Sequence, residues 1–292
     1  MYENAHSAWK ITVSESQRPR HPLEGPSHQE SEAEVMDVAL REGRAVRIVW
    51  AQAETPVITW GLLALIVIIF SPYLWQPDLY EKTILQGALY WPAVVQNGEW
   101  WRLITSIFLH ADLGHLAMNG LSLYYLGNNL ELSSGRRRYL LIFFLSGLAG
   151  SVLQLLLGEH RSFGVGASGA IFGMAGAVLL FMWQHRRYFP TTVRQSAMQM
   201  LLLLGLQLGL GFAVGQGIGN WAHLGGLIMG VACALVIGPM YVRPEGEPQK
   251  GPDGIGVYTM VDHKPLSGRR WAGVLLMVGV LLVGVFLLTQ SA

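Results

Sequence analysis

The sequence carries little charge for its length. Only 13% of its 292 residues are charged, whereas 51% are hydrophobic. A soluble chain of this length needs more charge to cover its surface, so the composition indicates a membrane protein. The net charge of +1 gives no basic footprint for nucleic acid, and we expect no nucleic-acid partner.

The sequence contains a single cysteine, Cys233. One cysteine cannot form an internal disulfide, and it excludes zinc sites built from two or four cysteines. Cys233 also lies in an apolar run, where a free cysteine usually acts as a small hydrophobic residue. We therefore assign no chemistry to it.

The first 56 residues lack a long apolar run. They are polar, mixed in charge and contain three prolines, and they show no segment typical of a cleaved signal peptide. The pattern predicts a mostly disordered arm over residues 1–30 and an amphipathic helix over residues 31–52. Residues 1–56 are interpreted as an N-terminal arm.

Long apolar runs recur through the rest of the chain. A helix needs about 20 apolar residues to cross a bilayer, and several of the runs here are short or rich in glycine. Small residues let membrane helices approach closely, so we predict an all-α polytopic bundle with helices buried against one another. The seven predicted spans are residues 57–75, 115–130, 139–157, 168–183, 197–214, 222–241 and 271–288.

The connection between the first two spans is unusually long. Residues 76–114 contain Trp91, Trp100 and Trp101, and such aromatic side chains concentrate at the membrane–water interface. We therefore expect interfacial helices that dip into one leaflet.

Lysine and arginine are divided very unevenly between the two sides. If the N-terminus is cytoplasmic, 17 of the 20 basic residues lie inside and only Lys82, Arg102 and Arg161 lie outside. The positive-inside rule then predicts a cytoplasmic N-terminus and an external C-terminus, and we expect the membrane to be a bacterial inner membrane. The predicted parts are a cytoplasmic arm (1–56), a six-helix core (57–241), a flexible cytoplasmic linker rich in proline and glycine (242–270), and a seventh transmembrane helix (271–292).

Polar side chains inside predicted spans are candidates for function. His115 and Asn119 are four residues apart, so they share one helix face, where both can donate hydrogen bonds. The alternative is that they only form hydrogen bonds between helices.

Ser168 follows a glycine-rich segment, Gly164-Val-Gly166-Ala, at the start of a predicted helix. Backbone N–H groups at a helix start can stabilise a developing oxyanion, which suits a nucleophile. The alternative is an ordinary N-cap serine. The G-x-S-x-G motif that surrounds the nucleophilic serine of α/β-hydrolases matches poorly, because Ala170 stands in place of the last glycine of the motif.

His223 lies just inside another apolar helix and is followed on the same face by small residues. The alternative is a histidine packed in the core without a chemical role. Against it, the stripe of small residues begins at the histidine itself, which favours close approach of a second helix to that residue. In the predicted topology His115, Ser168 and His223 all lie on the outer side. The small residues of the two stripes are Gly226, Gly230 and Ala234 on one helix and Gly169, Gly173 and Gly176 on the other.

Together these residues resemble the rhomboid family of intramembrane serine proteases, over roughly residues 100–230. The helix after the core is similar to the "six plus one" arrangement found among rhomboids. The matching motifs are Trp101-Arg102, His110 with His115 and Asn119, residues 125–131, Gly166-Ala-Ser168-Gly169, and Ala222-His223 followed by Gly226 and Gly230.

The resemblance implies a catalytic dyad in which Ser168 is the nucleophile and His223 its base. It implies an oxyanion hole formed by Asn119, His115 and the Ser168 backbone N–H. It implies substrates that are single-pass membrane proteins, embedded in lipid, with helix-weakening residues and a small residue before the cut, and neither metal nor cofactor. Supporting roles fall to Gly166, Phe172 (a tyrosine in many rhomboids), Arg102 and Glu131.

Three other functions stay open from the sequence. The first is an inactive rhomboid-like protein that binds membrane proteins without cutting them. The second is a transporter or channel, suggested by the glycine-broken helices. The third is a zinc protease using His110, His115 and His223, although no H-E-x-x-H motif is present.

Overall fold

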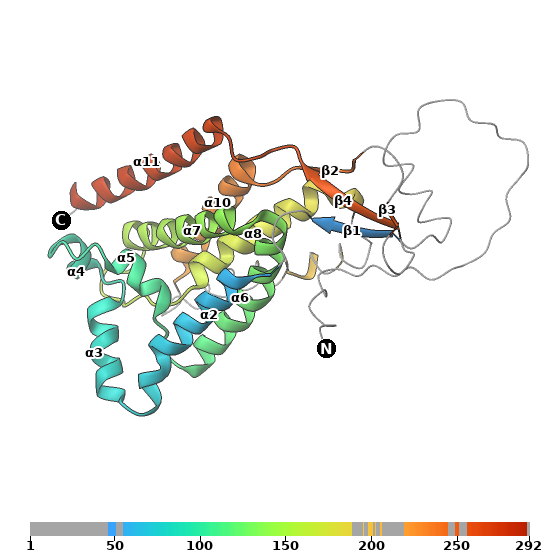
Figure 1. The fold of residues 1–292 in the computed structure, drawn as a ribbon. Coiled ribbons are helices and arrows are strands. Elements are labelled where there is room, and N and C mark those ends of the chain that lie inside the picture. The colour runs from blue at the N-terminus through green and yellow to red at the C-terminus, as the bar shows by residue number, and fades with distance from the viewer. Residues whose placement is uncertain are drawn as a thin grey trace, which may run out of the picture.

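The computed structural model describes residues 46–50, 55–188, 219–244, 249–250 and 256–290, with a few positions between 195 and 205. The described elements are mostly helices, which pack into a bundle with a small sheet beyond one end (Figure 1). The predicted fold class, an all-α membrane bundle, is confirmed for the body of the molecule. The sheet was not predicted.

Six of the seven predicted spans lie among the described residues, and each of the six is a helix. The remaining one, residues 197–214, lies almost wholly outside the described residues. The helices are α2 (Val57–Phe70, extended by the 3-10 turn η1, Ser71–Leu74), α6 (Leu113–Ser134), α7 (Arg136–Leu157), α8 (Ser168–Gln184), α10 (Asn220–Ile237) and α11 (Gly268–Gln290).

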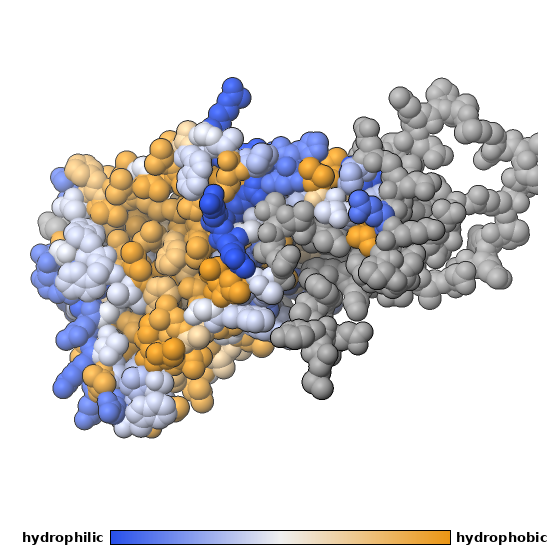
Figure 2. All heavy atoms as spheres, in the orientation of Figure 1, coloured by the Kyte–Doolittle hydropathy of each residue, from blue (hydrophilic) through white to orange (hydrophobic). Residues whose placement is uncertain are grey.

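Four helical segments in the described part are long and apolar enough to cross a membrane. They are Val57–Leu74, Arg136–Leu157, Asn220–Ile237 and Gly268–Gln290. Figure 2 shows hydrophobic residues gathered in a broad band over the helical body, with hydrophilic residues at its two ends. Such a band is the surface that a bilayer core requires of an integral membrane protein.

The long connection between α2 and α6 folds into short helices, as predicted. Proline stands in the first turn of α3 and of α4, where its missing N–H costs nothing. These short helices gather at the end of the bundle opposite the sheet (Figure 1). They are α3 (Pro77–Gly87), α4 (Trp91–Val95), α5 (Arg102–Thr105) and the 3-10 turn η2 (Ser106–Phe108).

Helix α10 packs directly on α8 along the two predicted small-residue stripes. A Cβ atom added at Gly226 would overlap the carbonyl oxygen of Gly169, and one added at Gly230 would overlap that of Gly173. On the side of α7, a Cβ at Gly225 would lie 2.7 Å from a backbone oxygen. The predicted packing of α8 on α10 is therefore confirmed, and it is a contact between backbones.

A small sheet joins the segment before α2 to the connection between α10 and α11. Its central strand β4 (Gly256–Asp262) pairs in parallel with β1 (Val46–Trp50) and antiparallel with β2 (Tyr241–Val242) and β3 (Gln249–Lys250). The buried ion pair between Arg138 of α7 and Asp262, 2.7 Å, attaches β4 to the bundle.

Two expectations are therefore wrong in part. The predicted helix over residues 31–52 is a strand at Val46–Trp50, because a run of β-branched and aromatic residues pairs readily once a partner strand is available. The predicted flexible linker, residues 242–270, is a strand at Gly256–Asp262. Residues 1–45 of the predicted arm lie outside the described part of the chain.

Candidate active site

Ser168 is the first residue of α8, and the turn before it depends on Gly166. Gly166 has φ +121°, a conformation that L side chains rarely adopt. Its N–H donates to the Ser106 carbonyl, 2.9 Å, and a Cβ there would lie 2.7 Å from the His115 ring. The N-cap is Ala167, so Ser168 is not the capping serine of the alternative interpretation, and its hydroxyl does not cap α8.

The Ser168 hydroxyl contacts the imidazole of His223. Nε2 of His223 lies 2.8 Å from Oγ of Ser168, a normal hydrogen-bond distance. The His223 side chain is buried, and its ring stacks on Phe172 with centroids 4.4 Å apart and planes 6° apart. Phe172 lies one turn after Ser168, so α8 supplies both the hydroxyl and the ring that confines the imidazole.

His115 and Asn119 converge beside the same loop from α6. Asp112 caps this helix by accepting the His115 N–H, 2.9 Å, which is the ordinary role of an N-cap aspartate. The His115 ring and the Asn119 amide nitrogen lie 2.7 and 3.5 Å from the position of a Cβ on Gly166. The amide also donates to the His115 carbonyl, 3.1 Å. Two hydrogen-bond donors therefore line the backbone just before Ser168.

His110, which belongs to the matching motifs and to the zinc-protease alternative, is a third histidine at this end of the bundle. Its ring meets the His115 ring edge to face, with centroids 5.2 Å apart. Burial lowers the pKa of His110 to about 4, helped by the neighbouring His115, so the ring is neutral near neutral pH. The Tyr80 hydroxyl donates to the His110 carbonyl, which holds this segment against α3.

Arg102 lies away from Ser168 and His223 and organises the long connection. Its buried guanidinium pairs with Glu99, 2.6 Å, and donates to the carbonyls of Leu85 and Ala88 at 2.9 and 2.8 Å. The next residue, Leu89, exchanges two backbone hydrogen bonds of 2.8 Å with Gly164. Arg102 is thus linked to the Ser168 loop through this backbone pairing.

Glu131 lies near the other end of α6 and is fully buried. Its carboxylate accepts the N–H groups of Ile58 and Thr59 at 3.0 and 2.8 Å, and the Thr59 hydroxyl at 2.8 Å. These donors belong to the first turn of α2, and a negative charge is favourable at the N-terminus of a helix. The arginines that follow α6 contribute little to this site, because Arg136 Nε is 3.9 Å away and Arg138 pairs with Asp262 instead.

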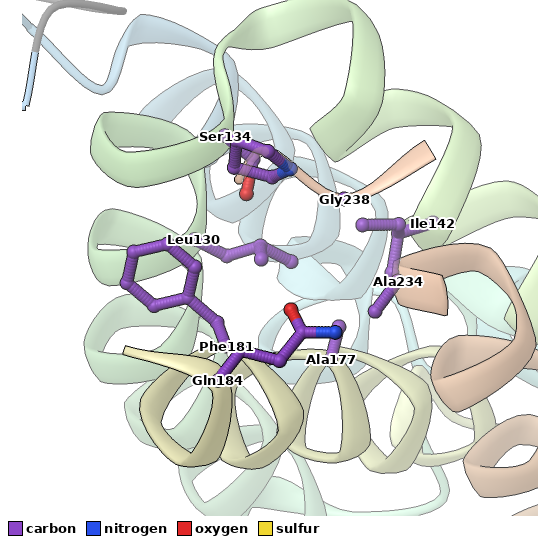
Figure 3. Close-up of a pocket in the computed structure, with 9 residues that line it drawn as sticks. Leu130, Ser134, Ile142, Ala177, Phe181, Gln184, Ala234 and Gly238 are labelled. Atoms are coloured by element: carbon purple, nitrogen blue, oxygen red, sulfur yellow. The ribbon is translucent and has the colours of Figure 1, made fainter. Parts of the chain in front are cut away.

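A small pocket lies at the end of α8 remote from Ser168 (Figure 3). Its walls are mostly apolar and come from α6, α7, α8 and α10, and none of them is a predicted site residue. The lining residues are Leu130, Ser134, Ile142, Ala177, Phe181, Gln184, Ala234, Gly238 and Pro239.

In the described residues, no group of three His, Cys, Asp or Glu side chains could hold a metal ion. The histidines of the zinc-protease alternative, His110, His115 and His223, form no such group.

The comparisons with known proteins agree with the motifs. A family model described as "Rhomboid domain" matches residues 97–240. Rhomboid protease GluP of Bacillus subtilis (strain 168) is 39% identical over 146 residues, which are 50% of this chain and 28% of GluP.

Plant relatives match over similar or greater lengths. RHOMBOID-like protein 6, mitochondrial, of Arabidopsis thaliana is 38% identical over 151 residues, 52% of this chain and 48% of the relative. RHOMBOID-like protein 4 of the same plant is 31% identical over 226 residues, 76% of this chain and 54% of the relative. The chain thus spans about half the length of these two relatives, and less of GluP.

Proposed function

This chain belongs to the rhomboid family, and on that premise we propose that it is a serine endopeptidase that cleaves transmembrane segments of membrane proteins. The observation that carries the proposal is the 2.8 Å contact between Ser168 Oγ and His223 Nε2. A serine hydroxyl is a weak nucleophile unless a base lies within hydrogen-bond reach. His223 meets that requirement at the start of a helix.

The proposed reaction uses the dyad twice. As Ser168 Oγ bonds to the scissile carbonyl carbon, its proton passes to Nε2 of His223. The tetrahedral intermediate then breaks its C–N bond, and the proton on Nε2 goes to the leaving amine. Water, deprotonated by the same nitrogen, attacks the acyl-serine, and Ser168 regains its proton when the acid product leaves. All these steps use only protein side chains and water.

The negative charge of the intermediate needs donors fixed in advance. The Asn119 amide and the His115 ring both face Gly166, two residues before the nucleophile, and the Ser168 N–H belongs to the first turn of α8, where N–H groups have no partner in the helix. These three groups are the proposed oxyanion hole. Phe172 keeps the stacking on His223 without the hydroxyl of the tyrosine found in many rhomboids.

The protein is an integral membrane protein, and we propose a cytoplasmic N-terminus, an external C-terminus and a bacterial inner membrane. The orientation is supported by the 17-to-3 division of basic residues. Its proposed substrates are single-pass membrane proteins whose helices are weakened near the outer surface. The proposed domain division stays at residues 1–56, 57–241, 242–270 and 271–292, with the linker carrying β4.

A serine-reactive fluorophosphonate probe tests the proposal on the purified full chain in detergent, beside cleavage of a model transmembrane substrate. Wild type should be labelled and active, and Ser168→Ala should lose both with an unchanged melting temperature. The control is Ser162→Ala in the same loop, whose hydroxyl bonds only to the Glu159 carbonyl. Labelling of Ser168→Ala at the wild-type rate would refute the dyad. A stable wild type that is neither labelled nor active would favour the non-cleaving rhomboid-like protein.

A further inference from the structure

Two polar atoms of α10 are buried beside the dyad without a partner. Nδ1 of His223 and Oδ1 of Asn220 have no hydrogen-bond partner among the described residues. Their residues are only 4% and 5% exposed. Because buried polar atoms are nearly always hydrogen-bonded in folded proteins, this coincidence at one site calls for a physical explanation.

The two atoms are chemically complementary. For Nε2 of His223 to accept the Ser168 proton, the neutral ring must carry its hydrogen on Nδ1, so Nδ1 is a donor. Oδ1 of the Asn220 amide is purely an acceptor. One atom lacks an acceptor and the other lacks a donor, and each is what the other requires.

Helix geometry places the two side chains together. Residues three apart on a helix lie on one face, with Cβ atoms about 5–6 Å apart. Side chains lean towards the helix N-terminus, so the His223 ring covers the turn that begins at Asn220. Gly219, and not Asn220, is the N-cap of α10, which leaves the Asn220 amide free of a capping role.

Among the described residues, none of the other groups around the ring is hydrogen-bonded to Nδ1. Phe172 covers a face of the imidazole, and the Ser168 hydroxyl occupies Nε2. His115 approaches from α6 as a second imidazole. On α7, Oε1 of Gln154 accepts the N–H of Ala222, 3.3 Å.

We propose that Asn220 is a positioning residue for His223, with its amide oxygen accepting the Nδ1 proton through one water molecule or after a rotation of the amide. This inference rests on the proposed function. The contact selects the tautomer in which Nε2 faces Ser168. When the Ser168 proton arrives at Nε2, the Nδ1 proton stays in place, and the amide dipole stabilises the imidazolium. The arrangement resembles the way a third residue orients the histidine of a serine protease triad, with a neutral oxygen in place of a carboxylate.

The test uses Asn220→Leu, which keeps the side-chain size and removes the acceptor, and Asn220→Asp, which keeps the acceptor. The matched control is Asn128→Leu, because Oδ1 of Asn128 is also buried without a partner among the described residues. Asn128 lies in the second half of α6, whereas His115 and Asn119 lie in the first half. The full chain is assayed for kcat and KM on the model substrate, for the rate of fluorophosphonate labelling and for melting temperature.

Asn220→Leu should lower kcat and the labelling rate by at least about tenfold, but by less than the roughly 10⁴-fold loss seen without a triad aspartate. KM and melting temperature should stay near wild type, Asn220→Asp should recover most of kcat, and Asn128→Leu should keep it. Wild-type kcat in Asn220→Leu would overturn the inference. So would a loss that follows the melting temperature and that Asn220→Asp does not reverse. An inactive wild type would refute the proposed function instead, so the two failures are distinct.

Discussion

The carbonyl oxygen of Gly169 occupies the place where a side chain on Gly226 would begin. Gly169 directly follows Ser168, the proposed nucleophile, and Gly226 lies three residues after the proposed base. The backbone contact of α8 with α10 therefore sets the separation of Ser168 and His223, whose side chains bond at 2.8 Å. Substitutions at this contact should affect the dyad without touching it.

Gly226→Ala is expected to separate α8 from α10. The added methyl group meets backbone, which cannot rotate away, and overpacking of this kind costs about 1–3 kcal/mol or more. Activity should fall along with the melting temperature. Gly279→Ala in α11 is the control, because a Cβ there has nothing within 4 Å, and it should leave both unchanged. A fully active, equally stable Gly226→Ala would mean that α8 and α10 are not in backbone contact.

Asn119→Ala tests the proposed oxyanion hole. Loss of one oxyanion donor typically lowers kcat by about 10²–10³-fold, and His115 and the Ser168 N–H would remain. His223→Ala should lose nearly all activity, because the serine then has no base. Asn129→Ala is the control on the same helix, since its amide donates to the carbonyl four residues back, as that of Asn119 does. Equal and complete loss in the Asn119 and His223 variants, both folded, would contradict these roles.

Glu131→Gln should destabilise the protein with little direct effect on the dyad. The carboxylate accepts three hydrogen bonds at the start of α2. The NH₂ group of a glutamine can only donate, so it would face N–H and O–H groups that also donate. A buried polar group left without a partner costs about 1–3 kcal/mol, which thermal unfolding in detergent would detect. Glu159→Gln, at an exposed position, is the control. A wild-type melting temperature in Glu131→Gln would show that this cap does not stabilise the fold.

Reporter fusions test the orientation in the membrane. A reporter fused after Gly158, where α7 ends, should register the outside, and one fused after Arg187, beyond α8, should register the cytoplasm. The reason is the excess of basic residues on the predicted inner side. The inverse pattern would place Ser168 and His223 at the cytoplasmic side and contradict the proposed topology.

The positions of the helices could be predicted because the signals are local. Apolar runs of spanning length identified α2, α7, α10 and α11, and a bilayer leaves a chain few alternatives to the helix. The strand β1 could not be predicted in this way. Its residues form a strand only because Val46 pairs with Gly256 and the residues after it pair in register with β4, a partner remote in the sequence.

The residues of the candidate site were likewise determined by the sequence, and their relations were not. The glycines on α8 and α10 already indicated close packing, because a missing Cβ is a property of the residue itself. Only the tertiary structure decided that Ser168 and His223, 55 residues apart, come within 2.8 Å. It also decided that Glu131 caps α2 and that Asn220 stands unpaired beside His223. Such relations depend on how whole helices pack, and no periodicity within one helix encodes its partner.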